Sequence, residues 1–563
     1  MLTLYTHEKC LLYAPFLLCS CGVLHRKISP PDVSSYSAQT PVVENIKDSL
    51  YYFEDNYLIR NQQGIWELYL SGNPLQLGLN SGALTQRLYH RQDSLLFSKL
   101  KDFVPSERKQ HFLYRFLKWF NRDIDHYILP IYRAELYGQS RYADSLFNYI
   151  APKYERSLYL HSAHDIGHAL QDLMLVGCSS LAAWGTHTQD GKLLIGRNFD
   201  FYLSDDFATE KLVRFVRPTE GYPFMSYAWG GMIGVMSGMN TEGLTVTINA
   251  GKSNIPLKAR TPISLLCREI LQFASTTEEA IAIAKKRKVF VSEAIMVGSA
   301  KEKKAVIIEV SPKKFGVYEV DNGLLLCTNH FQSTPYAKDK KNRKQIQQTH
   351  TAYRYKKLQE LTQGDTLTPE RIAAILRNTE GLKGKAIGYG NEKALNQLLA
   401  YHSVIFSPEE RIAWVSTAPY QLGEYIAYDL KEIFKGETFA PHTVYPQTQR
   451  NIPADPFMQT QAYKDYEQYR QLEERLTKQL REKALIDPAD YRALTSLNPD
   501  YWKAYYLLGE AYWANGQYEE AQEQYKIALT KEIPYTVERE QIEKRILLYQ
   551  PSSHSSSPSS SSP

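Results

Sequence analysis

The chain has 563 residues, of which 43% are hydrophobic and 23% charged, as in soluble globular proteins. Its length exceeds one ordinary domain, so two or three domains are expected. A net charge of only +5, from 66 basic and 61 acidic residues, argues against a nucleic-acid-binding protein. Two short basic runs, 285–288 and 338–344, are predicted to be solvated surface.

Residues 1–20 have the pattern of a signal peptide. Lys9 precedes an apolar run, 11–18, that is too short to span a bilayer. The run ends in Leu18-Cys19-Ser20-Cys21, which resembles a bacterial lipobox. That resemblance implies cleavage before Cys21, a lipid anchor on its thiol, and an exported protein held to the membrane and facing the periplasm. No later stretch is long and apolar enough to predict a transmembrane helix.

Three further segments follow the signal peptide, and the third of them is the main body of the chain. Residues 21–44 are rich in proline and serine and predict a tether. Residues 45–177 have a largely helical pattern, with an aromatic stripe at Phe112, Phe116 and Phe120 that should be core. Residues 178–440 alternate short β-type runs with turn dipeptides such as Asn322-Gly323, which predicts antiparallel sheets.

Helix start signals interrupt this β-rich segment, and helices take over after it. Starts are predicted at 261–262, 276–278 and 368–370, and the last strands at 403–406 and 412–416. Residues 441–500 read as a linker and a charged helix near 459–484. Residues 501–536 follow the tetratricopeptide pattern as a single unit, a possible site for a protein partner. Residues 551–563 are a serine-rich tail predicted to be disordered.

The cysteines beyond the signal peptide do not form a framework. Cys21, Cys178, Cys267 and Cys327 have no paired short spacings, which excludes a disulfide scaffold and a zinc site. Cys267 and Cys327 lie in apolar runs and are predicted to be core. The histidines at 161, 164 and 168 include one metal-type spacing but lack a third ligand, so neither a metal nor another cofactor is expected.

Cys178 begins a segment in which polar residues gather. A turn at Asp190-Gly191 predicts a hairpin between the strand at 178–184 and the strand that carries Arg197 and Asp200. With those two turn residues at its centre, Asp200 would face Leu181. The hairpin therefore brings a guanidinium and a carboxylate near the thiol, where the cation favours the thiolate.

Seven motifs in order resemble the acyl-coenzyme A:6-aminopenicillanic-acid acyltransferases, and more distantly the bile-salt and penicillin V hydrolases and acid ceramidase. They run from Trp66-Glu67-Leu68-Tyr69 to His402-Ser403-Val404, and include Gly177-Cys178, Gly196-Arg197-Asn198-Phe199-Asp200, Gly238-Met239-Asn240 leading to Asn249, Thr328-Asn329-His330-Phe331 and Tyr353-Arg354-Tyr355.

The resemblance implies an α+β fold, the αββα sandwich of N-terminal-nucleophile (Ntn) hydrolases, with a helical segment before it and a helical hairpin after it. It implies self-cleavage between Gly177 and Cys178. It also implies that Asn249 lines the oxyanion hole, that Asn329 lines the site, and that a second arginine acts there. Arg354 fits the motif for this arginine, and Arg343 is an alternative.

The chemistry implied is nucleophilic. The Cys178 thiol attacks the Gly177 carbonyl, and hydrolysis frees an α-amine that can then exchange protons near neutrality. The thiolate next attacks an amide-linked acyl group and forms a thioester. Hydrolysis is favoured over acyl transfer because water is abundant outside the cytoplasm. The substrate is expected to be a small N-acyl amide or peptide, and its acyl group and amine stay open.

Two alternatives remain at this point. One is a papain-like enzyme that uses Cys178 with His330 or His187 and with Asn329, without self-cleavage; the papain-type signature is absent. The other is a lipid-anchored binding protein that acts through the tetratricopeptide-like unit.

Overall fold

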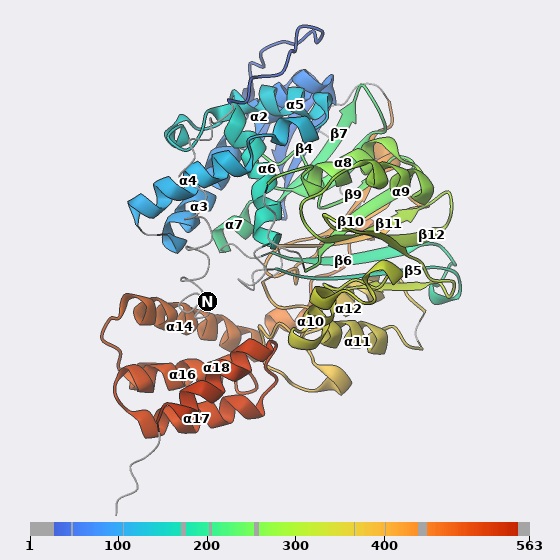
Figure 1. Ribbon diagram of the computed structural model, residues 1–563. Helices are drawn as coiled ribbons and strands as arrows, with labels where there is room; N and C mark the ends of the chain where they lie inside the picture. Colours follow the sequence, from blue (N-terminus) through green and yellow to red (C-terminus); the bar gives the residue numbers. More distant parts are fainter. Residues whose placement is uncertain are drawn as a thin grey trace, which may run out of the picture. The chain divides into compact units, whose positions relative to one another are not determined.

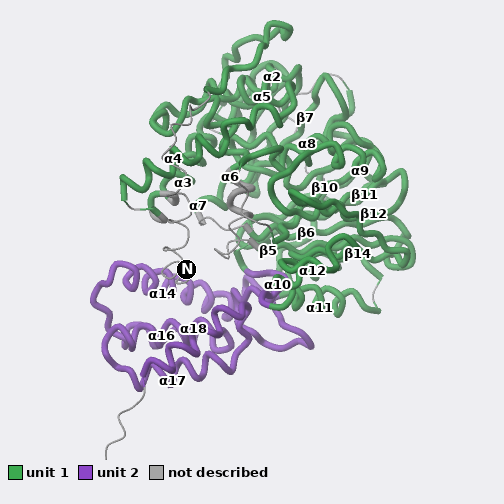
Figure 2. The backbone as a smooth tube through the Cα atoms, in the orientation of Figure 1, with its two compact units in different colours: residues 1–347, 351–378, 398–455 green, residues 348–350, 379–397, 456–563 purple. Residues whose placement is uncertain are grey.

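The computed structural model describes residues 27–46, 49–104, 106–169, 176–201, 205–252, 258–364, 366–399, 401–436 and 448–549. Two compact units divide the chain (Figure 2): unit 1 comprises residues 1–347, 351–378 and 398–455, and unit 2 comprises 348–350, 379–397 and 456–563. The predicted signal peptide 1–20, the lipidation site Cys21 and the tail 551–563 lie outside the described residues and stay predictions. Within those ranges, no helix combines the length and apolar character needed to cross a membrane.

Unit 1 is built on two β-sheets (Figure 1). The larger has eleven strands, in spatial order β1 (Glu44–Ile46), β2 (Leu50–Phe53), β3 (Asn56–Arg60), β4 (Trp66–Gly72), β7 (Leu212–Pro218), β8 (Phe224–Ala228), β9 (Ser237–Asn240), β10 (Leu244–Ala250), β11 (Glu293–Ser299), β12 (Lys304–Val310) and β13 (Phe315–Tyr318). The smaller has six, β14 (Leu324–Cys327), β5 (Val176–Ala183), β6 (Leu194–Phe201), β15 (His402–Ser407), β16 (Ile412–Ser416) and β17 (Tyr425–Asp429). The pairing of β4 with β7 is parallel, and the other pairings among these described strands are antiparallel.

The helices of unit 1 cover the sheets. They are α2 (Pro74–Leu84), α3 (Gln86–Phe103), α4 (Glu107–Phe120), α5 (Pro130–Ser140), α6 (Lys153–Ala169), α7 (Asp205–Thr209), α8 (Ile263–Phe273), α9 (Thr277–Lys286), α10 (Lys340–Gln348), α11 (Thr351–Leu361), α12 (Pro369–Leu376) and α13 (Leu430–Ile433). Helices α8 and α9 pack against β9–β12 of the larger sheet, and α11 and α12 pack against β14, β5, β6 and β15 of the smaller.

The apolar core lies between the two sheets. Side chains alternate along each strand, so every second residue enters this layer. Phe215 and Met225 of the larger sheet belong to the same buried cluster as Val404 and Val415 of the smaller. The residues of the opposite parity in the larger sheet, such as Val246, pack with the helices on its outer face. The result is a four-layer αββα sandwich, which confirms the predicted α+β architecture.

The segment predicted to be helical from residue 45 begins instead with strands. β1–β4 occupy 44–72, and helices begin only at Pro74. The reason lies in a period of two that the broader helical pattern masked. Trp66, Leu68 and Leu70 enter the helix-side cluster, whereas Tyr69 enters the layer between the sheets. In the predicted aromatic stripe of α4, Phe120 is buried and Phe116 packs at the edge of the core.

The predicted helix starts coincide with observed caps. Thr276 caps α9 and exchanges hydrogen bonds with Glu279 in a capping box. Thr368 accepts from the Arg371 amide at the start of α12, and Pro369 occupies the first turn. These local signals are short-range, and for that reason they can be read from sequence.

Unit 2 contains α14 (Gln461–Glu482), α15 (Ala493–Leu497), α16 (Trp502–Ala514), α17 (Tyr518–Thr530) and α18 (Thr536–Leu547). Helices α16 and α17 form the expected helical hairpin. Gly509 allows their close approach, because a Cβ atom there would lie 2.6 Å from the Tyr525 ring. Whether this hairpin is a tetratricopeptide unit stays a prediction.

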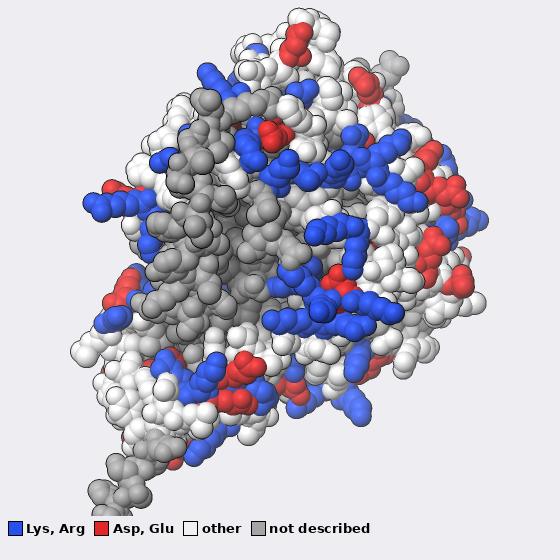
Figure 3. Space-filling model, in the orientation of Figure 1, with Lys and Arg blue, Asp and Glu red and all other residues white. Residues whose placement is uncertain are grey.

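The two basic runs are on the surface. Lys285, Lys286 and Lys288 are exposed at the end of α9, and most of 338–344 is exposed at the start of α10, a helix where a loop was expected. Figure 3 shows Lys and Arg side chains gathered over this region of unit 1, with acidic side chains beside them.

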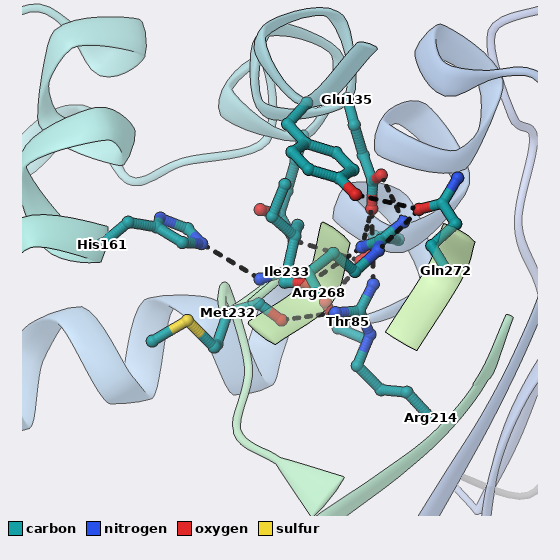
Figure 4. A network of polar contacts seen from close by, with 11 residues as sticks. Thr85, Glu135, His161, Arg214, Met232, Ile233, Arg268 and Gln272 are labelled. Carbon is teal, nitrogen blue, oxygen red and sulfur yellow. Dashed lines mark hydrogen bonds and ion pairs between the residues drawn. The ribbon is translucent and has the colours of Figure 1, made fainter. Parts of the chain in front are cut away.

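A buried ionic cluster joins the N-terminal helices to the rest of unit 1 (Figure 4). The Glu135 carboxylate on α5 accepts two hydrogen bonds from Arg268 on α8, at 3.2 and 2.9 Å, and lies 3.5 Å from Arg214 on β7. Arg268 also donates to the Ile233 carbonyl and to Gln272. All three charged side chains are at most 2% exposed, so each depends on the others for compensation.

We expect Glu135→Ala to lower the free energy of unfolding by about 3–5 kcal/mol, because two buried guanidinium groups would lose their carboxylate. Urea denaturation measures the change. Glu107→Ala, at an exposed position in the first turn of α4, is the matched control and should cost less than about 0.5 kcal/mol. Equal costs for the two variants would contradict the assignment of Glu135 as the link.

Candidate active site

The β5–β6 hairpin carries the predicted nucleophile, and its register differs from the expected one. Cys178 pairs with Phe199, and Gly177 pairs with Asp200. The prediction placed Asp200 opposite Leu181 and was wrong because the connection is longer than a two-residue turn. It includes a 3₁₀ turn at Gly185–His187 and a bridge from Thr188 to Leu367. The observed register sets Asp200 directly beside the predicted scissile bond.

The Cys178 side chain is fully buried in the layer between the sheets. Its nearest recorded polar neighbour is Arg197, whose Nη2 donates to Sγ at 3.6 Å. Burial raises the pKa of the Cys178 thiol, and the charges of Arg197 and Arg354 oppose that rise. In this uncleaved chain the group is therefore a neutral thiol beside a fixed cation, which would stabilise a thiolate as it forms.

Arg197 is held by neutral acceptors. Nη1 donates to Ser237 Oγ at 2.8 Å and to His402 Nε2 at 3.4 Å, and Nη2 donates to the Ile248 carbonyl. The guanidinium carbon lies 4.3 Å from the centre of the Phe199 ring. Because no carboxylate contacts the guanidinium in the described structure, its charge is left for the sulfur.

Asn329 and Arg354 hold the backbone of the nucleophile. The Cys178 amide donates to Asn329 Oδ1 at 2.9 Å, and this nitrogen would become the α-amine after cleavage. Arg354, from α11, donates to the Cys178 carbonyl, to Ser179 Oγ at 2.8 Å and to Asn329 Oδ1. The Asn329 amide is itself fixed by Thr351 Oγ1 at 2.8 Å.

Asp200 is buried beside Gly177 without a hydrogen-bond partner for either carboxylate oxygen in the structure. Burial raises the pKa of Asp200 to about 7, and the charges of Arg354 and Arg197 oppose that rise. A buried carboxyl group with unused acceptors is costly unless a donor reaches it in another state of the protein.

Asn249, on β10, contacts Ser180, which lies two residues after the nucleophile on β5. Its Oδ1 accepts from Ser180 Oγ at 2.7 Å, and its Nδ2 donates to the carbonyls of Cys327 and Thr328 at 3.3 Å each. An oxyanion role would require one of these two long bonds to be exchanged for the substrate oxygen.

The remaining candidates lie elsewhere. Arg343 is exposed and donates to the Ala337 carbonyl, so the structure brings Arg354 and not Arg343 to Cys178. His330 faces the hydroxyl groups of Thr328 and Thr351, and burial lowers its pKa to about 4. Neither His330 nor His187 has a recorded contact with the Cys178 sulfur, so the papain-like arrangement is not formed among the described residues.

Cys267 and Cys327 are buried, as expected of core residues. His161 is a buried core histidine whose two ring nitrogens contact the Ser157 carbonyl and the Ile233 amide. No group of three metal-ligating side chains occurs in the part of the chain that the structure describes.

Several residues that touch the site were not predicted. Ser180, Ser237 and Thr351 are small hydroxyl residues without a local motif, and their roles follow from pairing between distant strands. His402 belongs to a recognised strand motif, but its contact with Arg197 depends on the pairing of β15 with β6.

Comparison with known proteins identifies the region around this site. Residues 186–419 match the family of acyl-coenzyme A:6-aminopenicillanic acid acyl-transferases. The match covers less than half of the chain. The matched region begins eight residues after Cys178 and includes Arg197, Asp200, Asn249, Asn329 and Arg354. The matched family is one of acyltransferases, which favours the expected enzyme over the alternative of a non-enzymatic binding protein.

Other similarities are partial. An uncharacterized protein of Archaeoglobus fulgidus is 30% identical over 161 residues; the match covers 27% of this chain and 26% of that protein, so the chain spans about a quarter of the relative's length. Two solved structures also align. One is the Caenorhabditis elegans N-acylethanolamine-hydrolyzing acid amidase ortholog, with 18% identity over 41% of this chain and 93% of its own, and a TM-score of 0.30. The other is a mutant conjugated bile acid hydrolase from Clostridium perfringens, with 14% identity over 48% and 95%, and a TM-score of 0.30.

We expect Arg354→Met to lower the free energy of unfolding by about 1.5–3 kcal/mol, because a charged donor that holds the Cys178 carbonyl and Asn329 is lost. Arg343→Met is the matched control and should change stability by less than about 0.5 kcal/mol. Chemical denaturation of both variants measures the difference. A larger loss for Arg343→Met would reverse the assignment.

The Asp200 carboxyl predicts a pH dependence of stability. Its folded-state pKa, about 7, lies above the unfolded value, so the uncleaved protein loses stability as pH rises from about 4 through 7, by on the order of 4 kcal/mol. Urea denaturation of Cys178→Ala, which should stay uncleaved, measures this loss. The double variant Cys178→Ala/Asp200→Asn should show a smaller fall over the same range. Identical pH profiles would mean that Asp200 ionises freely in the folded state.

Proposed function

We propose that the chain is a self-processing N-terminal-cysteine amide hydrolase with Cys178 as the nucleophile. The observation that carries this proposal is Asp200, whose two buried oxygens lack donors while its strand position faces Gly177. Cleavage of the Gly177–Cys178 bond would create an ammonium group beside this carboxylate. The unused acceptors thus suit the mature enzyme better than the uncleaved chain.

Self-cleavage would begin with attack of the Cys178 sulfur on the Gly177 carbonyl carbon. The carbon–nitrogen bond breaks, the thiol proton passes to the departing nitrogen, and a thioester remains. Water then hydrolyses the thioester, which releases a carboxylate at Gly177 and restores the thiol. Glycine before the nucleophile keeps the attacked carbonyl free of side-chain obstruction.

In the mature enzyme the same sulfur would attack the carbonyl of an N-acyl substrate. Arg197, 3.6 Å from Sγ, favours the thiolate. Asn329 would orient the α-amine, which takes the thiol proton and passes it to the leaving amine. Asn249 would donate to the oxyanion, a type of interaction worth about 3–4 kcal/mol where one such donor has been removed. Water resolves the thioester and releases the acid.

Aromatic side chains beside the nucleophile favour an apolar acyl group. Phe199, directly across from Cys178, has its ring centre 5.1 Å from that of His402, and the His402 ring centre lies 4.4 Å from that of Tyr227, with the two rings tilted. Tyr401 continues the cluster toward Trp229, 5.6 Å away, which is partly exposed. Hydrolysis is proposed over transfer because the expected exported location offers water as the abundant acceptor.

Mass spectrometry of the purified protein tests self-processing. At 64.7 kDa for 563 residues, the segments 21–177 and 178–563 should have masses of about 18 and 44 kDa. We expect two chains in the wild type, one chain in Cys178→Ala, and two chains in the control Cys267→Ala. N-terminal sequencing of the larger chain should begin at Cys178.

A wild-type chain that stays intact and still hydrolyses N-acyl amides would support the amidase activity and contradict self-processing. A single chain without any activity would reject both parts of the proposal.

A further inference from the structure

Lys211 is a buried charge without a partner. The residue directly precedes β7 and is 3% exposed. Its Nζ has no hydrogen bond in the structure, and no ion pair to it occurs among the described residues. Burial lowers the pKa of Lys211 to about 8, so the side chain remains mostly protonated at neutral pH. An unpaired buried ammonium is costly, and such groups are normally paired or functional.

Strand alternation places this side chain in the layer between the sheets. Leu212 belongs to the helix-side cluster and Val213 to the inter-sheet cluster, so Lys211 lies on the inter-sheet face. His402 enters the same layer from β15, because Val404, two residues on, does so. Burial lowers the pKa of His402, and the charges of Arg197 and then Lys211 lower it further.

His402 presents a second unused donor in this layer. Its Nε2 accepts from Arg197 Nη1 at 3.4 Å and contacts Ser237 Oγ at 3.0 Å. A neutral ring that accepts at Nε2 carries its proton at Nδ1, and this buried atom has no hydrogen-bond partner. Lys211 Nζ and His402 Nδ1 are thus two buried donors that both lack an acceptor.

We propose that Lys211, with His402, binds a carboxylate of the substrate, which makes the preferred substrate an N-acyl amino acid or a related N-acyl amide that bears a carboxylate. This inference rests on the proposed function, since it specifies the substrate of the same site. Through His402 and Arg197 the subsite is linked to the Cys178 sulfur. A carboxylate supplies the acceptor that both donors lack and compensates the ammonium charge.

No side-chain hydrogen bond or ion pair in the described structure gives Lys211 a structural role. Glu135 on the helix side of the larger sheet is matched by two arginines, whereas Lys211 on the opposite face has no acid. Replacing a paired buried charge destabilises a protein, but replacing an unpaired one by an apolar side chain of similar size removes a desolvation cost. Lys211 should therefore be dispensable for folding and needed for binding.

The experiment compares N-octanoylglycine with N-octanoylglycinamide, which differ only in the carboxylate. We expect Lys211→Met to lower kcat/KM for the glycine compound by about tenfold or more, mainly through KM, and to change that for the amide less than about twofold. Lys288→Met, at an exposed lysine, should leave both values unchanged. The melting temperature of ligand-free Lys211→Met should equal or exceed that of the wild type.

Equal effects on the two compounds, or a fall in melting temperature like that expected for Glu135→Ala, would overturn the proposal. If the wild type hydrolyses neither compound, calorimetry on that same protein replaces the kinetics. If the wild type binds the glycine compound more tightly than the amide, and Lys211→Met loses this preference, the carboxylate subsite is supported although the proposed hydrolase activity is not. No such preference in either measurement rejects the subsite.

Discussion

The pairing of β5 with β6 is the constraint on which the site depends. Its register sets Gly177 opposite Asp200 and Cys178 opposite Phe199. A shift by one residue would turn every side chain of the strand to the other face. Arg197 and Cys178 would then no longer share the layer between the sheets. The strands on either side, β14 and β15, hold this register and bring Asn329 and His402 to the same centre.

Much of this centre could be predicted from the sequence because its residues occur in compact motifs. Gly177-Cys178, Arg197, Asp200 and Asn329 each stand within a short run of characteristic composition. The hairpin register could not be obtained in the same way. The turn dipeptide Asp190-Gly191 is a strong local signal, but the 3₁₀ turn before it and the bridge to Leu367 depend on the folded chain.

The strands at 44–72 were also missed from the sequence, where a helical segment was predicted. In β4 the side chains on both faces are buried because the strand lies inside the sheet between β3 and β7, so the alternation that identifies a half-buried strand is weak. The helices α9 and α12 were easier to place since their caps are local. Lys211 and Glu135 had no signal at all, because a charged residue in sequence does not reveal whether it will be buried or what will face it.

Buried charged side chains form ion pairs on one face of the larger sheet and lack them on the other. On the helix side, Glu135 and its arginines compensate one another, which suits a fixed joint between segments. In the layer between the sheets, Arg197 and Lys211 contact no carboxylate among the described residues. The buried acids of this layer, Glu67 and Glu309, accept instead from neutral donors such as Tyr428 and Ser333.

A buried cation without an acidic partner stabilises an anion that forms or binds beside it. The proposed cleavage would add a further cation, the α-ammonium of Cys178, and Asp200 would be the acid beside it. The two remaining cations would then stabilise the Cys178 thiolate beside Arg197 and the proposed ligand carboxylate beside Lys211. Nucleophile activation and substrate selection would thus draw on one electrostatic feature of the fold.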